Sequence, residues 1–392
     1  MTSSFDGKLR YNQTSDFEEA YLPSQNPQNH ASNLLELANG DLLCAWFSGT
    51  QEGVSDISIY LARLPKGESQ WSIPIKISND PSRSEQNPVL FEEPDSKRVW
   101  ILYTAQKFGN QDTAIVRYRT SEDCGYTWSE IQTLIDEPGT FIRQPILILK
   151  DSAWVLPIFH CATPRGKKWV GDYDTAAVKV SRDKGRTWQE FPVPDSVGCV
   201  HMCINFLPDG RLVALYRSRW ADAIYRSESA DGMHWSAPQI TSLPNNNSSI
   251  QATTLADGRL AIVFNNISAK ESSDRRASLY DEIEEGVVRE EEKNHAVAIP
   301  VDAQERKAIW GVPRAPLSLA ISSDGGKTWP LLRNIQEGDG NCLSNNSREK
   351  KNRELSYPSI KQGKDGSLHV SYTYYRQTIK YVHLAKDWVS KK

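Results

Sequence analysis

Short runs in which apolar and polar residues alternate occur in pairs along this chain, and an Asn-Gly or Asp-Gly turn separates the two runs of a pair. Alternation with a period of two is typical of a β-strand with one buried face. Asn-Gly or Asp-Gly between two such runs indicates a β-hairpin. The clearest pairs lie at 34–46, 204–216, 252–264 and 360–372. The pattern therefore predicts an all-β chain built from hairpins.

A second motif, Ser-x-Asp-x-Gly-x-Thr-Trp, the Asp-box, alternates with these hairpins. It begins at Ser121, Ser181 and Ser322, and a degenerate copy begins at Ser229. Ser and Asp side chains bind the backbone of their own turn, Gly adopts positive φ, and Trp packs beneath the hairpin. Repetition of one such unit indicates a repeat architecture.

The spacing of the repeats predicts the number of blades of a β-propeller. The leading strands start near His30, Gln86, Arg143, His201, Ser248 and Tyr357. The steps between them are 56, 57, 58 and 47 residues, followed by one step of 109. A four-stranded blade takes about 40 to 50 residues, so we expect a single six-bladed domain over residues 1–392. The long step predicts an insertion loop at 265–316 within blade five, and the run from Lys8 to Gln13 is expected to close the last blade.

Composition and charge exclude several classes of partner. The net charge is −3 and no basic stripe interleaves with aromatic residues, so we expect no nucleic-acid partner. No apolar stretch approaches the ~18 residues of a membrane span, and the first residues lack the basic start and apolar core of a signal peptide. We therefore expect no membrane partner, and a protein that is cytoplasmic or secreted with its signal removed. The oligomeric state stays open.

Neither a cofactor nor a set of metal ligands is evident in the sequence. The six cysteines show no Cys-x-x-Cys spacing, which favours free thiols. A structural cation held by backbone oxygens in the central channel stays open. The charged stretch from Glu282 to Lys293 lacks strand alternation, and we interpret it as a solvated loop or short helix of the insertion, with a lid as the alternative.

Candidate site residues follow from propeller geometry. Residues that begin inner strands or end second strands lie on one rim, around the central funnel. Histidine exchanges protons near neutral pH, and arginine binds carboxylates bidentately. The candidate catalytic residues are His30, His160, His201 and Tyr357. The candidate substrate-binding residues are Trp46, Asp56, Gln86, Arg143, Arg217, Arg219, Arg275 and Arg353. For each of them a scaffold role, such as a structural hydrogen bond or salt bridge, is the alternative.

The Asp-boxes, the hairpins and the rim residues together resemble the sialidase-like (BNR, Asp-box) propeller superfamily over nearly the whole chain. The resemblance implies an arginine clamp for a substrate carboxylate, which Arg217 or Arg219 would join, and an acid matched by Glu52 or Asp56. Tyr357 would match the nucleophilic tyrosine of sialidases. The chain departs from sialidases at Asn29-His-Ala-Ser32, at His201 and at Tyr372-Thr-Tyr374, where sialidases carry an arginine motif, an acid and a glutamate.

The chain is more similar to a divergent branch of that superfamily, which contains rhamnose-glucuronate lyases and α-L-rhamnosidase-like propellers. The segments that carry this likeness are His30–Ser32, Trp46–Gly53 and Leu243–Ser249. The resemblance implies a catalytic histidine and an arginine that neutralises the carboxylate. Some of these relatives are counted as seven-bladed, which makes seven blades the alternative to six.

Three functions remain open from the sequence. We favour an exo-acting enzyme that removes a terminal sugar, such as rhamnose linked to glucuronate, from an anionic glycan by β-elimination. Glycosidases ordinarily need two carboxyl groups across the scissile bond, and only the acidic cluster of Glu52 and Asp56 is evident. The second function is hydrolysis, as an atypical exo-sialidase (neuraminidase) or α-L-rhamnosidase. The third is a non-catalytic propeller that binds a glycan.

Overall fold

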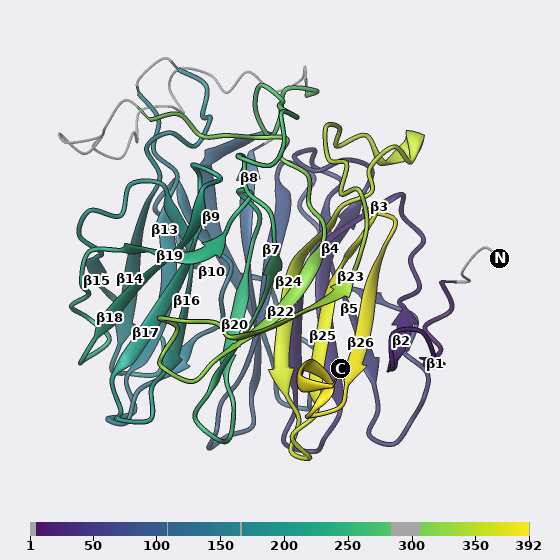
Figure 1. Ribbon diagram of the computed structural model, residues 1–392. Helices are drawn as coiled ribbons and strands as arrows, with labels where there is room; N and C mark the ends of the chain where they lie inside the picture. Colours follow the sequence, from purple (N-terminus) through teal and green to yellow (C-terminus); the bar gives the residue numbers. More distant parts are fainter. Residues whose placement is uncertain (1–4, 108, 165–166, 284–305, 392) are drawn as a thin grey trace.

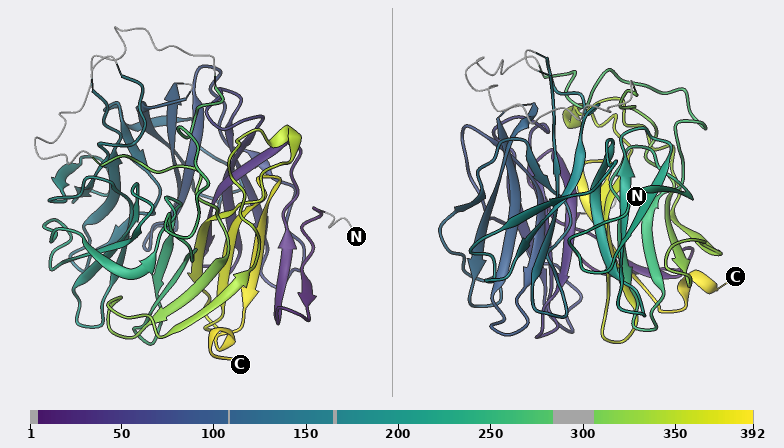
Figure 2. Two further views of the ribbon diagram at one scale, coloured as in Figure 1. Left: turned by 45° about the horizontal axis from the view of Figure 1, so that its top comes forward. Right: turned by 90° about the vertical axis from the view of Figure 1, so that its left-hand side faces the viewer.

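The chain folds into six antiparallel sheets that stand around a common axis (Figures 1 and 2). The computed structural model describes residues 5–107, 109–164, 167–283 and 306–391. The six sheets confirm the predicted six-bladed β-propeller, and the seven-bladed alternative is wrong. Among the described residues, the helical segments are two short 3-10 turns, Ser347–Glu349 and Trp388–Ser390. No helix of the described part of the chain is long and apolar enough to cross a membrane.

Each blade is numbered from its inner strand outward. Blade 1 contains β3 (Gln28–Glu36), β4 (Leu42–Gly49), β5 (Ser58–Leu64) and β6 (Ile75–Lys76). Blade 2 contains β7 (Ser84–Glu92), β8 (Val99–Lys107), β9 (Asn110–Ser121) and β10 (Gln132–Ile135). Blade 3 contains β11 (Thr140–Ile142), β12 (Leu147–Ile148), β13 (Trp154–His160), β14 (Thr175–Ser181) and β15 (Gln189–Pro192).

The remaining three blades complete the ring. Blade 4 contains β16 (Cys199–Phe206), β17 (Leu212–Ser218), β18 (Ala223–Ser229) and β19 (Gln239–Pro244). Blade 5 contains β20 (Gln251–Thr254), β21 (Leu260–Asn265), β22 (Leu317–Ser322) and β23 (Leu331–Gln336). Blade 6 contains β24 (Leu355–Gln362), β25 (Leu368–Tyr374), β26 (Thr378–Leu384), β2 (Phe17–Tyr21) and β1 (Arg10–Asn12).

The N-terminal segment closes the ring, as predicted, but with a different strand. Strand β2 pairs antiparallel with β26, and β1 lies outside β2 as a fifth strand (Figure 1). The expected segment, Lys8 to Gln13, is therefore one strand too early. The reason is burial: Phe17 and Ala20 of β2 pack into the core, whereas none of the β1 side chains is buried.

The four Asp-boxes form the predicted turns between the third and fourth strands of blades 2 to 5. In the first box, the Oγ of Ser121 accepts the N–H of Gly125 at 2.7 Å, and the Oδ1 of Asp123 accepts the N–H of Thr127 at 2.8 Å. The hydrogen bond from the Thr127 hydroxyl, followed by the backbone one, lowers the pKa of Asp123 to about 2. These turns hold the scaffold together.

Four inner strands carry the same β-bulge where they begin. Two residues of the inner strand oppose one residue of the second strand, and the first of the two has positive φ. These first residues are Ala31, Asn87, His201 and Tyr357, and they face Trp46, Tyr103, Tyr216 and Tyr372. A bulge bends the strand and changes the direction of its side chains. The bulges thus direct His201 and Tyr357 differently from the regular alternation.

The connection from β21 to β22 spans residues 266–316, and its described flanks pack against other blades. The Tyr280 hydroxyl accepts a hydrogen bond from Gln111 of blade 2 at 3.0 Å, and the Nε1 of Trp310 donates to the Val170 carbonyl at 3.0 Å. Of the charged stretch 282–293, only Glu282 and Ile283 belong to the described residues. All six cysteines are free thiols, and Cys124 alone among them is not buried.

Candidate active site

The bulge of β24 places Tyr357 at the centre of a group of basic side chains. The ring of His30 lies 4.2 Å from the Tyr357 ring, and the ring of His201 lies 5.7 Å from it, centroid to centroid. Three guanidinium carbons lie over the same ring at 5.4, 5.6 and 5.5 Å, those of Arg143, Arg217 and Arg314. We call Tyr357, His30, His201, Arg143, Arg217 and Arg314 the Tyr357 group. The group draws on blades 1, 3, 4 and 6 and on the connection before β22, so the folded ring brings it together.

His30 is uncharged in this environment. Its Nδ1 lies 2.8 Å from the Thr373 hydroxyl, and its Nε2 lies 3.3 Å from a nitrogen of Arg376. A guanidinium can only donate, so Nε2 accepts and Nδ1 carries the proton. Burial, followed by the charge of Arg376, lowers the pKa of His30 well below 6.5.

His201 has the same arrangement of hydrogen bonds. Its Nδ1 donates to the Ser249 hydroxyl at 3.0 Å, and its Nε2 accepts from Nη1 of Arg217 at 3.4 Å. Burial, followed by the charge of Arg217, lowers the pKa of His201 well below 6.5. The same Nη1 of Arg217 donates to the Tyr357 hydroxyl at 2.6 Å. His201 and Tyr357 thus share one guanidinium nitrogen.

Arg143 and Arg217 are buried cations without a described carboxylate partner. Arg143 donates to the Ser249 hydroxyl at 3.2 Å and to the Ser32 carbonyl at 3.0 Å. Within the described residues, Nη1 of Arg143 and Nη2 of Arg217 have no hydrogen-bond partner. Burial lowers the pKa of Arg143 to about 10 and that of Arg217 to about 9. Both groups would gain from a bound anion.

Arg314 belongs to a buried chain of alternating charges. The Nη1 of Arg314 lies 2.5 Å from an oxygen of Glu354, and the other oxygen of Glu354 binds Arg376. Arg376 also binds Glu52 at 2.5 Å. Burial alone would raise the pKa of Glu354, but Arg376 and Arg314 hold it well below 4.5. The carboxylate of Glu354 is therefore ionised and bound on both oxygens.

Arg219 forms a separate pair beside the Tyr357 group. Its Nη2 lies 2.7 Å from Oδ2 of Asp174, whose Oδ1 accepts the indole N–H of Trp169 at 2.9 Å. The guanidinium carbon of Arg219 lies 5.2 Å from the ring of Trp310 and 5.8 Å from that of Phe159. Phe159 in turn lies 5.1 Å from His201. Five buried guanidinium groups thus meet three buried carboxylates here, which leaves an excess of positive charge.

Gln86 lies in β7, the inner strand of blade 2, and is not a member of the Tyr357 group. It is buried at the bulge of β7, where its Nε2 donates to the Ser84 hydroxyl at 3.0 Å. Its Oε1 accepts the Tyr280 hydroxyl at 3.4 Å. Gln86 therefore contacts the described flank of the insertion.

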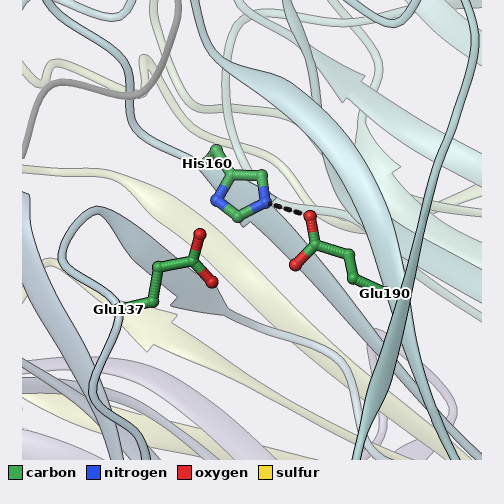
Figure 3. Close-up of side chains that lie close together, drawn as sticks. All are labelled: Glu137, His160 and Glu190. Atoms are coloured by element: carbon green, nitrogen blue, oxygen red, sulfur yellow. Dashed lines mark hydrogen bonds and ion pairs between the residues drawn. The ribbon is translucent and has the colours of Figure 1, made fainter.

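His160 lies away from Tyr357, in the outer part of blade 3. Its Nε2 is 2.8 Å from Oε1 of Glu190 (Figure 3). One ligand atom each from Glu137, His160 and Glu190 lie within 4.8 Å of one another, as in a metal site. However, the ammonium of Lys179 is 2.7 Å from Glu190 and 3.4 Å from Glu137. This cluster already holds a cation, so we assign it no metal.

The structure does not bring the other four predicted residues to the Tyr357 group. Trp46 is buried in the core of blade 1 and donates to the Asn29 side chain at 2.9 Å. Asp56 is exposed and accepts the N–H of Thr50. Arg275 binds carbonyl oxygens of its own loop, such as that of Ser272 at 2.9 Å. Arg353 is exposed and paired with Asp339 at 2.7 Å.

Some members of the site had no clear signal in the sequence. Arg314 stands in Gly-Val-Pro-Arg, which has no periodicity, and only its place just before β22 indicates the rim. Glu354 directly precedes β24 and Arg376 follows the end of β25 by two residues, so both lie on the rim. Their sequence does not reveal that they bind each other.

Residues 40–370 match the sequence profile of the BNR repeat-like domain family. Among solved structures, the chain is similar to the Hadza microbial sialidase Hz136, at 14% identity over 93% of this chain and 67% of that one, with a TM-score of 0.66. It is similar to the intramolecular trans-sialidase from Ruminococcus gnavus, at 12% identity over 99% of both chains and a TM-score of 0.66.

A protein of unknown function from Dyadobacter fermentans gives 14% identity over 96% of this chain and 99% of that one, with a TM-score of 0.67. No curated protein matches the chain in sequence. At these identities the likeness to solved structures shows the fold, a propeller of the sialidase type.

Proposed function

The chain belongs to the BNR repeat-like domain family, and we propose that it is a carbohydrate-active enzyme that cleaves a terminal sugar from an anionic glycan. One observation carries this proposal. Arg143 and Arg217 are fully buried beside Tyr357, and each keeps a nitrogen without a described partner. Burying a cation without a counter-ion is costly, so the fold maintains these charges for a ligand that supplies one.

A carboxylate is the anion that suits this pair. A guanidinium binds a carboxylate through two parallel hydrogen bonds, and such a contact would satisfy the free nitrogens of Arg143 and Arg217. The carboxylate of a uronic acid would then lie beside the Tyr357 hydroxyl and the His201 ring, because both contact Nη1 of Arg217. In this arrangement the carbon next to the carboxylate would lie close to two groups that exchange protons.

The chemistry that these groups support best is β-elimination. Nε2 of His201 takes the proton from C5 of the uronate, the C4–O bond breaks, and a double bond forms between C4 and C5. The Tyr357 hydroxyl gives its proton to the leaving oxygen, and the two arginines neutralise the carboxylate, which lowers the barrier to C5 deprotonation. The charges of Arg217, Arg219 and Arg143 help to lower the pKa of His201. A bound carboxylate offsets those charges and makes the imidazole a stronger base.

Hydrolysis is less well supported by the carboxylates near Tyr357. A glycosidase needs a protonated carboxyl group beside the leaving oxygen. Glu354 is ionised and bound on both oxygens, Glu52 is bound to Arg376, and Asp174 is bound to Arg219. The Tyr357 hydroxyl contacts Arg217, whereas a tyrosine nucleophile needs a base. Hydrolysis stays the second candidate because the similar structures of the same fold include a sialidase and a trans-sialidase.

Product analysis in heavy-oxygen water tests the proposal. Glycans with a terminal sugar linked to O4 of glucuronate, and an α-sialoside, are incubated with the protein, and products are identified by mass spectrometry. Elimination gives an unsaturated uronate and no heavy oxygen, whereas hydrolysis adds one water and incorporates the label. Arg217→Met is expected to lower kcat/KM by about a hundredfold or more, and Arg182→Met, which removes an exposed arginine of an Asp-box turn, is the matched control. Binding of the glycans without any turnover would refute the enzyme proposal and leave a glycan-binding propeller.

A further inference from the structure

We propose that a cavity between blades 3 and 4, just outside the Tyr357 group, binds a neutral sugar unit of the same glycan. The inference rests on the proposed function, because the proposed function assigns the anionic unit of the glycan to Arg143 and Arg217. The cavity has a volume of about 540 Å³ and is lined by His160, Thr175, Glu190, Val197, Trp220 and Arg306, among others. We call it the outer cavity. Its volume lies within the range of small-molecule pockets, about 300–1,000 Å³.

Three residues that line the outer cavity directly follow, along the chain, a residue that packs beside the Tyr357 group. His160 follows Phe159, whose ring lies 5.1 Å from His201. Thr175 follows Asp174, and Trp220 follows Arg219, which are the two members of the buried ion pair. Neighbouring Cα atoms are about 3.8 Å apart. The outer cavity therefore lies next to residues that pack beside the Tyr357 group, and we assign a further unit of the glycan to it.

The described lining of the outer cavity has no basic group left without an acidic partner, and its remaining charge is the exposed carboxylate of Asp195. Glu190 binds Lys179 at 2.7 Å, and Arg306 binds Asp222 at 2.9 Å. The Tyr357 group differs from this lining, because its Arg143 and Arg217 lack a described counter-ion. A lining without an uncompensated cation does not select an anionic unit, so we expect an uncharged sugar here.

The lining nevertheless offers hydrogen bonds and an apolar wall. His160 is 6% exposed, and its Nδ1 has no hydrogen-bond partner among the described residues, while its Nε2 is held by Glu190. A buried polar nitrogen without a partner is unfavourable, and a ligand hydroxyl would satisfy it. Val197 and Trp220 supply apolar surface in the same cavity. A neutral sugar ring suits this lining, because its hydroxyl groups form hydrogen bonds and its C–H groups pack against apolar side chains.

A binding experiment tests the cavity independently of turnover. Methyl glycosides of glucose, galactose and mannose are titrated into the full chain and followed by saturation-transfer NMR. Val197→Trp fills the cavity from its partly exposed loop, and Leu332→Trp adds the same bulk to the exposed outer strand of blade 5 as a matched control. We expect at least one glycoside to bind, with an affinity about tenfold weaker in Val197→Trp and unchanged in Leu332→Trp and Arg217→Met.

The outcomes separate this inference from the proposed function. If no glycoside binds the unmodified protein, the outer cavity is not a sugar site, whether or not the protein cleaves glycans. If Arg217→Met abolishes binding and Val197→Trp does not, the sugar binds at the Tyr357 group and the inference is wrong. Where turnover is observed, Val197→Trp should raise KM for a longer glycan and leave KM for the smallest anionic substrate unchanged. An equal effect on both substrates would also overturn the inference.

Discussion

Arg217 and Arg219 stand two residues apart at the end of one strand, and replacing each with methionine should have opposite effects on stability. Both side chains are 1% exposed. Arg219 is paired with Asp174 at 2.7 Å, whereas Arg217 contacts the neutral oxygens of Asn247 and Tyr357 at 2.8 and 2.6 Å. Arg219→Met leaves Asp174 as a buried charge without its partner. Arg217→Met removes a buried charge that had no carboxylate partner among the described residues.

The structure sets the size of the two effects. Breaking a buried ion pair costs about 3–5 kcal/mol, which is the loss of unfolding free energy expected for Arg219→Met. Burial lowers the pKa of Arg217 from 12.5 to about 9, a cost of several kcal/mol at about 1.4 kcal/mol for each pKa unit. The three lost hydrogen bonds, to Asn247, His201 and Tyr357, are worth about 1 kcal/mol each. Arg217→Met should therefore be neutral or stabilising by about 1–2 kcal/mol, although it removes the proposed carboxylate contact.

Urea unfolding with and without glucuronate measures both effects. Glucuronate at a hundredfold excess over Kd should raise the unfolding free energy of the unmodified protein by about 2.7 kcal/mol and should not stabilise Arg217→Met. Loss of the contact should also lower kcat/KM by about a hundredfold or more. Equal destabilisation by the two substitutions would refute the description of Arg217 as an uncompensated cation. Stabilisation of Arg217→Met by glucuronate would place the carboxylate elsewhere.

Three further predictions follow from other parts of the molecule. Tyr357→Phe should lower kcat by about a hundredfold or more, and a variant that keeps full kcat in steady-state kinetics would exclude the hydroxyl as the proton donor. Glu354 has a pKa held well below 4.5, so its charge stabilises the fold above that pH and the contribution is lost as pH falls through the lowered pKa. Glu354→Gln should therefore reduce the loss of stability at acid pH. Thermal unfolding would contradict this if the variant lost stability with falling pH as steeply as the unmodified protein. Asp123→Ala removes the acceptor of the first Asp-box turn and should cost about 1 kcal/mol by urea unfolding without a change in kcat; a loss of activity would show that the turn affects the site.

The fold was predictable because its signals are local. Each hairpin turn and each Asp-box uses side chains a few residues apart, so the sequence shows them directly. The strand that closes the ring was misplaced by one because Lys8 to Gln13 and Phe17–Tyr21 both have strand-like patterns. The tertiary packing distinguishes them: Phe17 and Ala20 are buried, and Phe17 packs against Trp388 at 5.9 Å between ring centroids.

The site was only partly predictable because its members act across blades. His30, His201, Tyr357, Arg143 and Arg217 were found from the rule that strand entrances and exits share one rim. Trp46 satisfies the same rule, yet its indole faces the core and binds Asn29. The rule predicts at which end of a strand a residue lies. It does not predict the direction of the side chain, and that direction depends on the bulges.

The backbone at the bulges explains how Tyr357 and His201, the two residues proposed to exchange protons, come to contact the same guanidinium. Both residues have positive φ, 52° and 55°, a conformation that costs about 1–2 kcal/mol for a residue with a side chain and that glycine adopts freely. Blades 1 and 2 have Ala31 and Asn87 at the same step of the bulge, so the bulge itself does not require an aromatic or an imidazole side chain. The fold accepts this strain at all four bulges, and at two of them the strained residue, Tyr357 or His201, contacts the guanidinium of Arg217. Strain of this kind gathers at functional sites, and here it coincides with the uncompensated charge of Arg217.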